Sequence, residues 1–162
     1  MRVLGCLDGS NGELIGNAVQ MFTTSDEPLT IALLAVIDAG PRQDIDRMRE
    51  RFWRPPMHHQ PVTAEMLAAE TAAAQETLNA GLAYAKAAET LVRQGRPELE
   101  IVNAAAEWRA EVIVIGARTE YGEPPHIGPH SVGHVARFVL DHAPCPVLLV
   151  RPLAREQFPI NR

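Results

Sequence analysis

Unbroken apolar runs alternate with amphipathic stretches along the chain. Residues 112–115 read Val-Ile-Val-Ile and residues 147–150 read Val-Leu-Leu-Val, and a helical pattern precedes each run. Continuous apolar runs of this length, flanked by helices, are typical of parallel strands that are covered on both faces. The pattern predicts strands at residues 3–7, 29–37, 89–93, 112–115 and 146–150.

The stretches between these runs predict helices. After the first strand, Ser10 and Glu13 form the S-x-x-E pattern of a capping box, and apolar residues then recur on one helical face. An alanine-rich helix is expected at residues 63–86, another begins near Pro97, and a short one covers residues 133–141. The apolar stripes of the first and third helices are Leu14, Ile15, Ala18, Val19 and Phe22, and Ile101, Val102, Ala105 and Trp108.

The order of these elements predicts the fold class. Strands that alternate with helices indicate an α/β fold with one doubly wound parallel sheet and helices on both faces. We expect a single domain at residues 1–152, with an irregular insertion at residues 41–61 and a short polar tail at residues 153–162. Ligands of such sheets bind at the carboxyl ends of the strands, near the point where the strand order reverses.

Composition and charge narrow the classes of function. The formal net charge is -5, so the sequence offers no electrostatic case for a nucleic-acid partner or an anionic membrane. No apolar run is long enough to span a bilayer, and the start of the chain lacks the layout of a signal peptide. Cys6 and Cys145 do not form a disulfide framework and are interpreted as small buried hydrophobic residues in strands. These features favour a reducing cytoplasmic location.

Five segments together carry a family resemblance. They are VLGCLDGS at residues 3–10, LAVID at 34–38, GRPELEI at 95–101, VIVIGAR at 112–118 and HAPCPVLLV at 142–150. In this order and spacing they resemble a universal stress protein domain over nearly the whole chain, apart from residues 41–61 and the tail. The resemblance implies a five-stranded parallel sheet of order 3-2-1-4-5, usually dimeric. It also implies that some members bind ATP or another adenine nucleotide at the carboxyl edge of the sheet.

The resemblance further implies where a nucleotide would lie. An aspartate after the first strand, here Asp8, sits by the adenosine, and Val36 meets the adenine edge through its backbone. The phosphate loop of the family is G-x2-G-x9-G-[ST]. Gly116 matches its first glycine and Gly133 its last. The nucleotide-binding residues that the resemblance implies are Asp8, Val36, Ile115, Gly116, Thr119, Gly133, His134 and Val135.

The phosphate loop departs from this pattern in three ways. Thr119 stands at the second glycine, His134 replaces the serine or threonine, and sixteen residues rather than twelve separate Gly116 from Gly133. Gly122 or Gly128 could supply the missing glycine along a shifted path. Two interpretations therefore stay open: a regulatory module that binds ATP or AMP, and a nucleotide-free dimeric protein that acts through interactions in the stress response.

Histidines recur near this loop. His126, His130 and His134 are spaced like metal ligands on one helical face, but Gly128 and Gly133 interrupt a continuous helix. We therefore expect no metal site and interpret these side chains as solvated, with His134 able to donate a hydrogen bond to phosphate. No catalytic motif is present, so no catalytic residue is predicted, and slow ATP hydrolysis is implied only by the resemblance.

The last strand bears on assembly. In the strand order of the family, the strand from Pro146 to Val150 lies at an edge of the sheet, and an exposed apolar edge is a liability unless another strand covers it. We therefore predict a homodimer in which this strand pairs with its symmetry mate.

Overall fold

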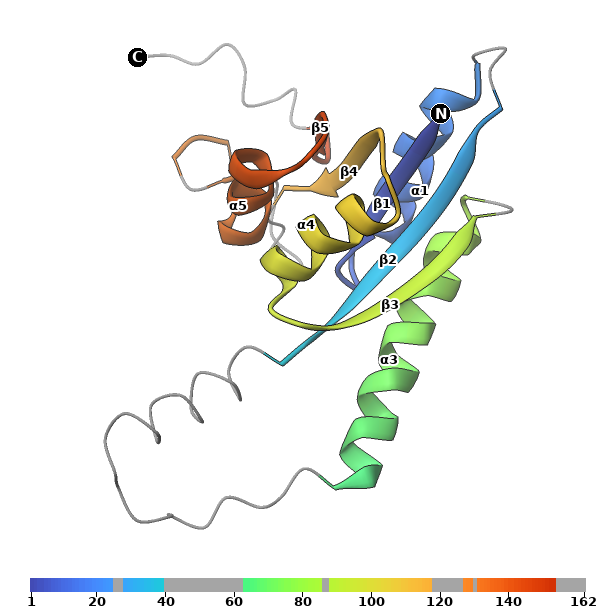
Figure 1. The fold of residues 1–162 in the computed structure, drawn as a ribbon, viewed down its shortest axis with the longest axis vertical. Coiled ribbons are helices and arrows are strands. Elements are labelled where there is room, and N and C mark those ends of the chain that lie inside the picture. Colours follow the sequence, from blue (N-terminus) through green and yellow to red (C-terminus); the bar gives the residue numbers. More distant parts are fainter. Residues whose placement is uncertain (25–27, 40–62, 86–87, 118–126, 130, 154–162) are drawn as a thin grey trace.

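One parallel sheet organises the chain. The computed structural model describes residues 1–24, 28–39, 63–85, 88–117, 127–129 and 131–153 (Figure 1). Its strands are β1 (Arg2–Leu7), β2 (Thr30–Asp38), β3 (Glu89–Gly95), β4 (Val112–Gly116) and β5 (Val147–Val150). They pair in parallel in the order β3-β2-β1-β4-β5. The expected α/β class and strand order are thereby confirmed.

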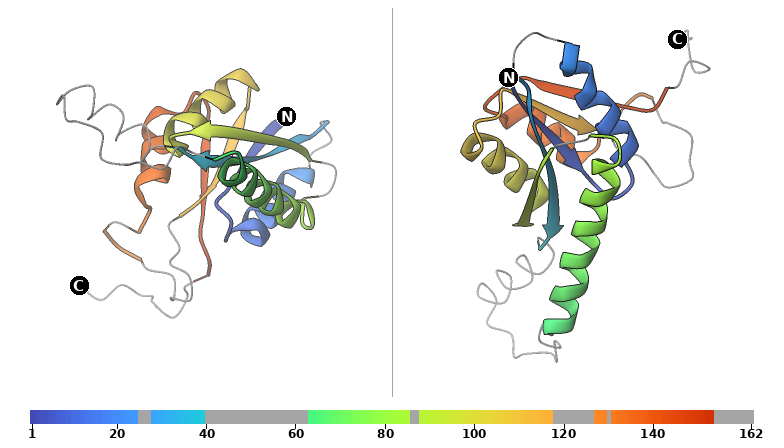
Figure 2. Two further views of the ribbon diagram at one scale, coloured as in Figure 1. Left: turned by 90° about the horizontal axis from the view of Figure 1, so that it is seen from below. Right: turned by 90° about the vertical axis from the view of Figure 1, so that its right-hand side faces the viewer.

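Helices cover both faces of the sheet (Figures 1 and 2). They are α1 (Gly12–Gln20), continued by a 3-10 turn at Met21–Thr24, α3 (Ala64–Leu82), α4 (Pro97–Glu107) and α5 (His134–His142). Because side chains alternate along a strand, β1 contributes to two separate cores. Val3 and Leu7 pack with α1 and α3, whereas Leu4 and Cys6 pack with α4 and α5.

The strand order reverses between β1 and β4. From β1 the chain builds β2 and β3 on one side, and it then crosses to add β4 and β5 on the other. Cys6 of β1 stands level with Leu34 of β2 and Ile115 of β4. The carboxyl ends of β1, β2 and β4 therefore lie together at the switch point, where ligands of such sheets bind.

The capping box predicted at Ser10 and Glu13 is wrong. Helix α1 begins at Gly12, its N-cap residue is Asn11, and no side chain makes a standard capping bond. Instead, Asp8 Oδ1 accepts hydrogen bonds from the backbone N–H groups of Ser10 (2.9 Å) and Asn11 (3.1 Å). A carboxylate two residues before the expected cap thus accepts the backbone donors of the turn, and the reciprocal bonds of a capping box do not form.

The ends of α3 and β3 differ from the ends that the sequence predicts. Thr63 caps α3 by accepting the N–H of Met66 at 3.2 Å, and the helix ends at Leu82 rather than at residue 86. Strand β3 runs on to Gly95 because it pairs with β2 along its whole length. Pro97 stands in the first turn of α4, as expected. The insertion at 41–61 and the tail residues 154–162 lie outside the described residues.

The prediction for the cysteines is half right. Cys6 is buried within β1. Cys145, by contrast, precedes β5 and is only partly buried. Pro144 and Pro146 flank it, and a proline cannot donate a ladder hydrogen bond, so the strand begins only at Val147. Both thiols are free.

Candidate ligand-binding site

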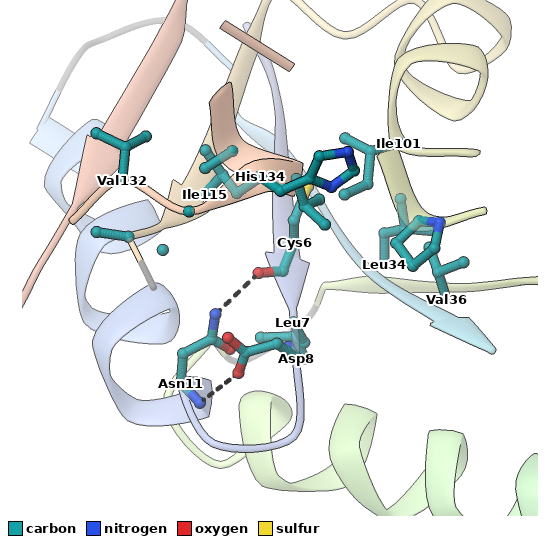
Figure 3. A pocket seen from close by; sticks show the side chains of 16 residues that line it. Cys6, Leu7, Asp8, Asn11, Leu34, Val36, Ile101, Ile115, Val132 and His134 are labelled. Carbon is teal, nitrogen blue, oxygen red and sulfur yellow. Dashed lines mark hydrogen bonds between the residues drawn. The ribbon is translucent and has the colours of Figure 1, made fainter. Parts of the chain in front are cut away.

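A cavity of about 470 Å³ opens where β1, β2 and β4 end (Figure 3). This volume lies within the range of small-molecule and cofactor sites. One wall is the carboxyl edge of the sheet, a second is the first turn of α4, and a third is the N-terminus of α5. The lining residues are Cys6, Leu7, Asp8, Asn11, Leu34, Val36, Pro97, Ile101, Ile115, Gly116, Ala117, Val132, Gly133, His134, Val135 and Ala136.

The residues implied by the sequence resemblance gather here. Seven of the eight line the cavity, namely Asp8, Val36, Ile115, Gly116, Gly133, His134 and Val135. Thr119, the eighth, lies outside the described residues, as do His126 and His130. The fold therefore brings residues from β1, β2, β4 and α5 to one place, while their role in nucleotide binding stays a prediction.

Asp8 follows β1, and hydrogen bonds within the turn hold one of its two carboxylate oxygens. Its Oδ1 accepts three hydrogen bonds within the turn, from the backbone N–H groups of Ser10 and Asn11 and from Ser10 Oγ at 2.9 Å. Asp8 itself is exposed. With Oδ1 held by the turn, the direction of Oδ2 is also fixed, which orients the carboxylate for a donor such as a sugar hydroxyl.

Asn11 is a polar site residue that sequence reasoning missed, along with apolar lining residues such as Leu34 and Ile101. It lines the cavity and is only 6% exposed, although asparagine is mostly found on protein surfaces. Its Oδ1 accepts the N–H of Asp8 at 3.1 Å, and its Nδ2 donates to the carbonyl oxygen of Cys6 at 3.4 Å. The only sequence signal was a polar residue at the start of a helix, which reads as an ordinary cap.

The N-terminus of α5 forms the polar wall opposite the sheet. Gly133 is its N-cap residue with φ +84°, a left-handed conformation that a residue with a side chain rarely adopts. No side chain caps this helix. Gly133, His134 and Val135 at this end of the helix line the cavity, and the first backbone N–H groups of a helix have no partner within it. His134, the first residue of α5, is exposed and lies beside the cavity (Figure 3).

The remaining walls are apolar. Leu34, Val36, Ile101 and Ile115 present aliphatic side chains from both sheet and helix (Figure 3). The thiol of Cys6 lies in the same wall, and its burial, with a smaller contribution from Cys145, raises its pKa from 9.0 to about 12. A thiol that stays protonated at neutral pH is a poor nucleophile. This wall therefore suits an aromatic ring rather than covalent chemistry.

A smaller hollow of about 270 Å³ lies on the other side of β2. It shares Leu7, Asp8 and Val36 with the larger cavity and adds acidic side chains from β2 and α3, Asp38 and Glu70. Among the described residues, no group of three histidine, cysteine or acidic side chains could hold a metal ion. Within the same residues, no helix is long and apolar enough to cross a membrane.

The fold and the site define a class: a doubly wound α/β domain with a ligand-sized cavity at its switch point. The sequence model of the universal stress protein family matches residues 1–151, and the chain belongs to that family. A comparison with curated protein sequences finds no match.

Solved structures share the fold. The universal stress protein UspA from Lactobacillus plantarum is 24% identical, with a TM-score of 0.63 over 93% of this chain and 97% of that one. A universal stress protein from Archaeoglobus fulgidus is 19% identical, with a TM-score of 0.52 over 92% of each chain. A family protein from Arabidopsis thaliana, solved with AMP bound, is 17% identical, with a TM-score of 0.55 over 99% of this chain and 97% of that one.

Proposed function

We propose that this chain is a regulatory module that binds an adenine nucleotide, AMP or ATP, in the cavity at the carboxyl edge of the sheet. One observation carries the proposal. A cavity of ligand size is lined by the seven described residues that the sequence resemblance implies for nucleotide binding. The fold brings them together from the carboxyl ends of β1, β2 and β4 and from the start of α5.

The walls of the cavity suggest how each part of a nucleotide would be held. The adenine ring would lie against the aliphatic side chains of Leu34, Val36 and Ile101, where burial of an aromatic face is favourable. A ribose hydroxyl would donate to the Asp8 carboxylate. The phosphate would meet the first N–H groups of α5 and the imidazole of His134.

Precedent within the fold supports this assignment. The Arabidopsis thaliana protein, whose fold matches nearly all of this chain, was solved with AMP bound. At 17% identity the likeness establishes the fold alone, so the proposal rests on the residues that line the cavity here. Slow hydrolysis of ATP would need a general base, and the described lining residues offer only Asp8 and His134 as candidates.

The test is direct binding. Nucleotide released by denaturing freshly purified protein should be identified by mass spectrometry, and AMP and ATP should then be titrated by calorimetry. We expect saturable binding of at least one adenine nucleotide with one site per chain. Absence of heat and of retained nucleotide, at millimolar concentrations of both ligands, would overturn the proposal.

A second function, as a nucleotide-free dimeric interaction protein, is favoured by one observation. The side chains of β5, at the edge of the sheet, are all partly exposed although all four are Val or Leu. A second copy that pairs along this edge would cover them. A homodimer is compatible with nucleotide binding. The interaction function would stand alone only if the nucleotide titrations show no binding.

The cysteines bear on the location of the protein. The thiols of Cys6 and Cys145 are free, and we propose on this basis a reducing cytoplasmic location.

A further inference from the structure

The carboxamide of Asn11 joins the turn after β1 to the end of that strand. It bonds to β1 through the carbonyl oxygen of Cys6 and to the turn through the N–H of Asp8. The backbone N–H of Asn11 in turn donates to Asp8 Oδ1 at 3.1 Å (Figure 3). Asn11 and Asp8 are therefore joined by two reciprocal hydrogen bonds: the Asn11 carboxamide holds the backbone of Asp8, and the Asp8 carboxylate holds the backbone of Asn11.

Gly116 at the end of β4 borders the same carboxamide. A Cβ atom built on Gly116 would lie 2.9 Å from Asn11 Nδ2, and the next nearest atoms, at 3.8 Å, also belong to Asn11. Real Cβ atoms essentially never approach a heavy atom so closely. An alanine at this position would therefore push on a carboxamide that two hydrogen bonds hold in place.

The backbone at Gly116 gives no other reason for a glycine. Its φ lies outside the left-handed region, so an L-residue could adopt the same conformation. Strand β4 ends there in regular pairing with Val150 of β5. The close approach of Asn11 is the steric feature that keeps a side chain from this position.

We propose that Asn11 is a positioning residue of the nucleotide site, and that Gly116 lacks a side chain in order to accommodate it. The inference rests on the proposed nucleotide binding. It changes the role of Gly116, because the glycine then acts through Asn11 on Asp8 rather than by letting phosphate approach its own backbone. The adenosine end of the site would depend on a side-chain contact between α1 and β4.

The test is a set of double-mutant cycles read by the calorimetric Kd for AMP. The first cycle combines Gly116→Ala with Asn11→Ala, and the second combines Asp8→Ala with Asn11→Ala. Asn17→Ala is the matched control, because Asn17 is an exposed asparagine on the same helix. The melting temperature of each variant shows that it is folded. Asn11→Ser, whose hydroxyl can replace one lost bond, serves if Asn11→Ala does not fold.

We expect Gly116→Ala and Asn11→Ala each to weaken AMP binding about tenfold, the effect of one disturbed hydrogen-bond network. The double variant should bind no more weakly than Asn11→Ala alone, since the new methyl group then enters the space that the carboxamide has left. Asp8→Ala should cost less affinity in the Asn11→Ala background, because the backbone N–H of Asp8 then has no carboxamide at residue 11 to hold it in place. Loss of stability alone would lower the melting temperatures without producing this pattern in affinity.

Three results would contradict the inference. If Gly116→Ala weakens AMP binding by the same factor with and without Asn11, the glycine serves the ligand directly. If Asp8→Ala costs the same factor in both backgrounds, Asn11 does not position Asp8. In both cases the wild-type protein still binds AMP and the proposed function stands. If the wild-type protein binds no adenine nucleotide, the proposed function and this inference both fail.

Discussion

The guanidinium group of Arg2 stacks on the indole ring of Trp108, 4.1 Å from its centroid, and Arg2 Nε donates a hydrogen bond to the Trp108 carbonyl oxygen at 2.9 Å. The pair joins the start of β1 to the end of α4. Arg2→Ala should lower the free energy of unfolding by about 1–2 kcal/mol, the sum of a half-exposed cation–π contact and one hydrogen bond. Urea denaturation would measure the change.

Two variants serve as controls for the contact between Arg2 and Trp108. Arg2→Lys keeps the charge but loses the planar group, so it should recover less than half of the lost stability. Arg93→Ala removes an exposed ion pair with Glu107 and should change the free energy of unfolding by less than about 1 kcal/mol. Equal effects of Arg2→Ala and Arg93→Ala would mean that the stacked contact contributes nothing specific.

The buried thiol of Cys6 should make stability depend on alkaline pH. Its pKa is about 12 in the folded chain because of burial, against an ordinary value of 9.0. Between these values the folded state holds a proton that the unfolded state has lost. The contribution of Cys6 to stability is therefore complete below the ordinary pKa of the thiol, and it falls by about 1.4 kcal/mol per pH unit above it.

Denaturation of the wild-type protein and Cys6→Ala between pH 8 and pH 10.5 would measure this slope. Cys6→Ala should start from a lower stability and show a shallower alkaline slope. Cys145→Ala is the matched control, since Cys145 is only partly buried and the substitution should remove less of the slope. Identical slopes in the wild-type protein and Cys6→Ala would show that the Cys6 thiol ionises in the folded chain as it does in the unfolded one.

Asp8 should contribute to ligand affinity through its charge. Asp8→Ala should weaken AMP binding about tenfold to a hundredfold, the range for a hydrogen bond to a charged group. Asp8→Asn keeps the Oδ1 acceptor that Ser10 and Asn11 use, so it should retain the turn but lose part of the affinity. Asp141→Ala, at an exposed position on α5, is the calorimetric control. An unchanged Kd for Asp8→Ala would exclude Asp8 from the site.

His134 should act on the phosphate and not on the nucleoside. His134→Ala should weaken AMP binding several-fold, roughly the value of one hydrogen bond, and leave adenosine binding unchanged. His142→Ala alters the other end of α5, where the ring stacks on Phe138, and should change neither Kd. Equal losses for AMP and adenosine would place His134 away from the phosphate.

The free edge of β5 should mediate dimerisation. The carbonyl oxygens of Pro146 and Val150 accept hydrogen bonds from Ile113 and Ala117 of the β4 side. Because the N–H and C=O groups of alternate residues point to opposite sides of a strand, the N–H groups of Val147, Leu149 and Arg151 point outward. Arg151→Pro removes one outward donor and should weaken a dimer that Arg151→Ala leaves intact. Light scattering at micromolar concentrations would distinguish them, and a monomeric wild-type protein would contradict the proposed dimer.

The sequence predicts which strands and helices surround the site better than it predicts the hydrogen bonds within the site. Buried strands are continuous apolar runs in the sequence. The residue types at 112–115 and 147–150 are therefore sufficient to predict β4 and β5. The residues at their carboxyl ends then follow from the parallel order. Val36, Gly116 and Gly133 reach the cavity for this reason, because their positions depend only on where each strand or helix ends.

The turn after β1 was not predictable in the same way. In Asp8-Gly9-Ser10-Asn11, three side chains can accept backbone N–H groups near the start of the helix, and the S-x-x-E pattern favours Ser10 as the cap. The structure gives the donors to Asp8, while Asn11 turns inward to Gly116. The contact between Asn11 and Gly116 joins residues that are far apart in the sequence. Local patterns cannot represent such a contact.

The central place of β1 has a consequence for the slow opening motions that hydrogen exchange detects. β1 is hydrogen-bonded along both edges, to β2 and to β4, so its amides should open only when the whole domain unfolds. Helix α5 packs against α4 and the edge strand β5, and it can open with that smaller unit. A ligand in the cavity would touch both. Its binding should therefore slow hydrogen exchange in α5 while leaving the amides of β1 at their already slow rate. The ligand would connect the most stable part of the domain to a part that opens more easily.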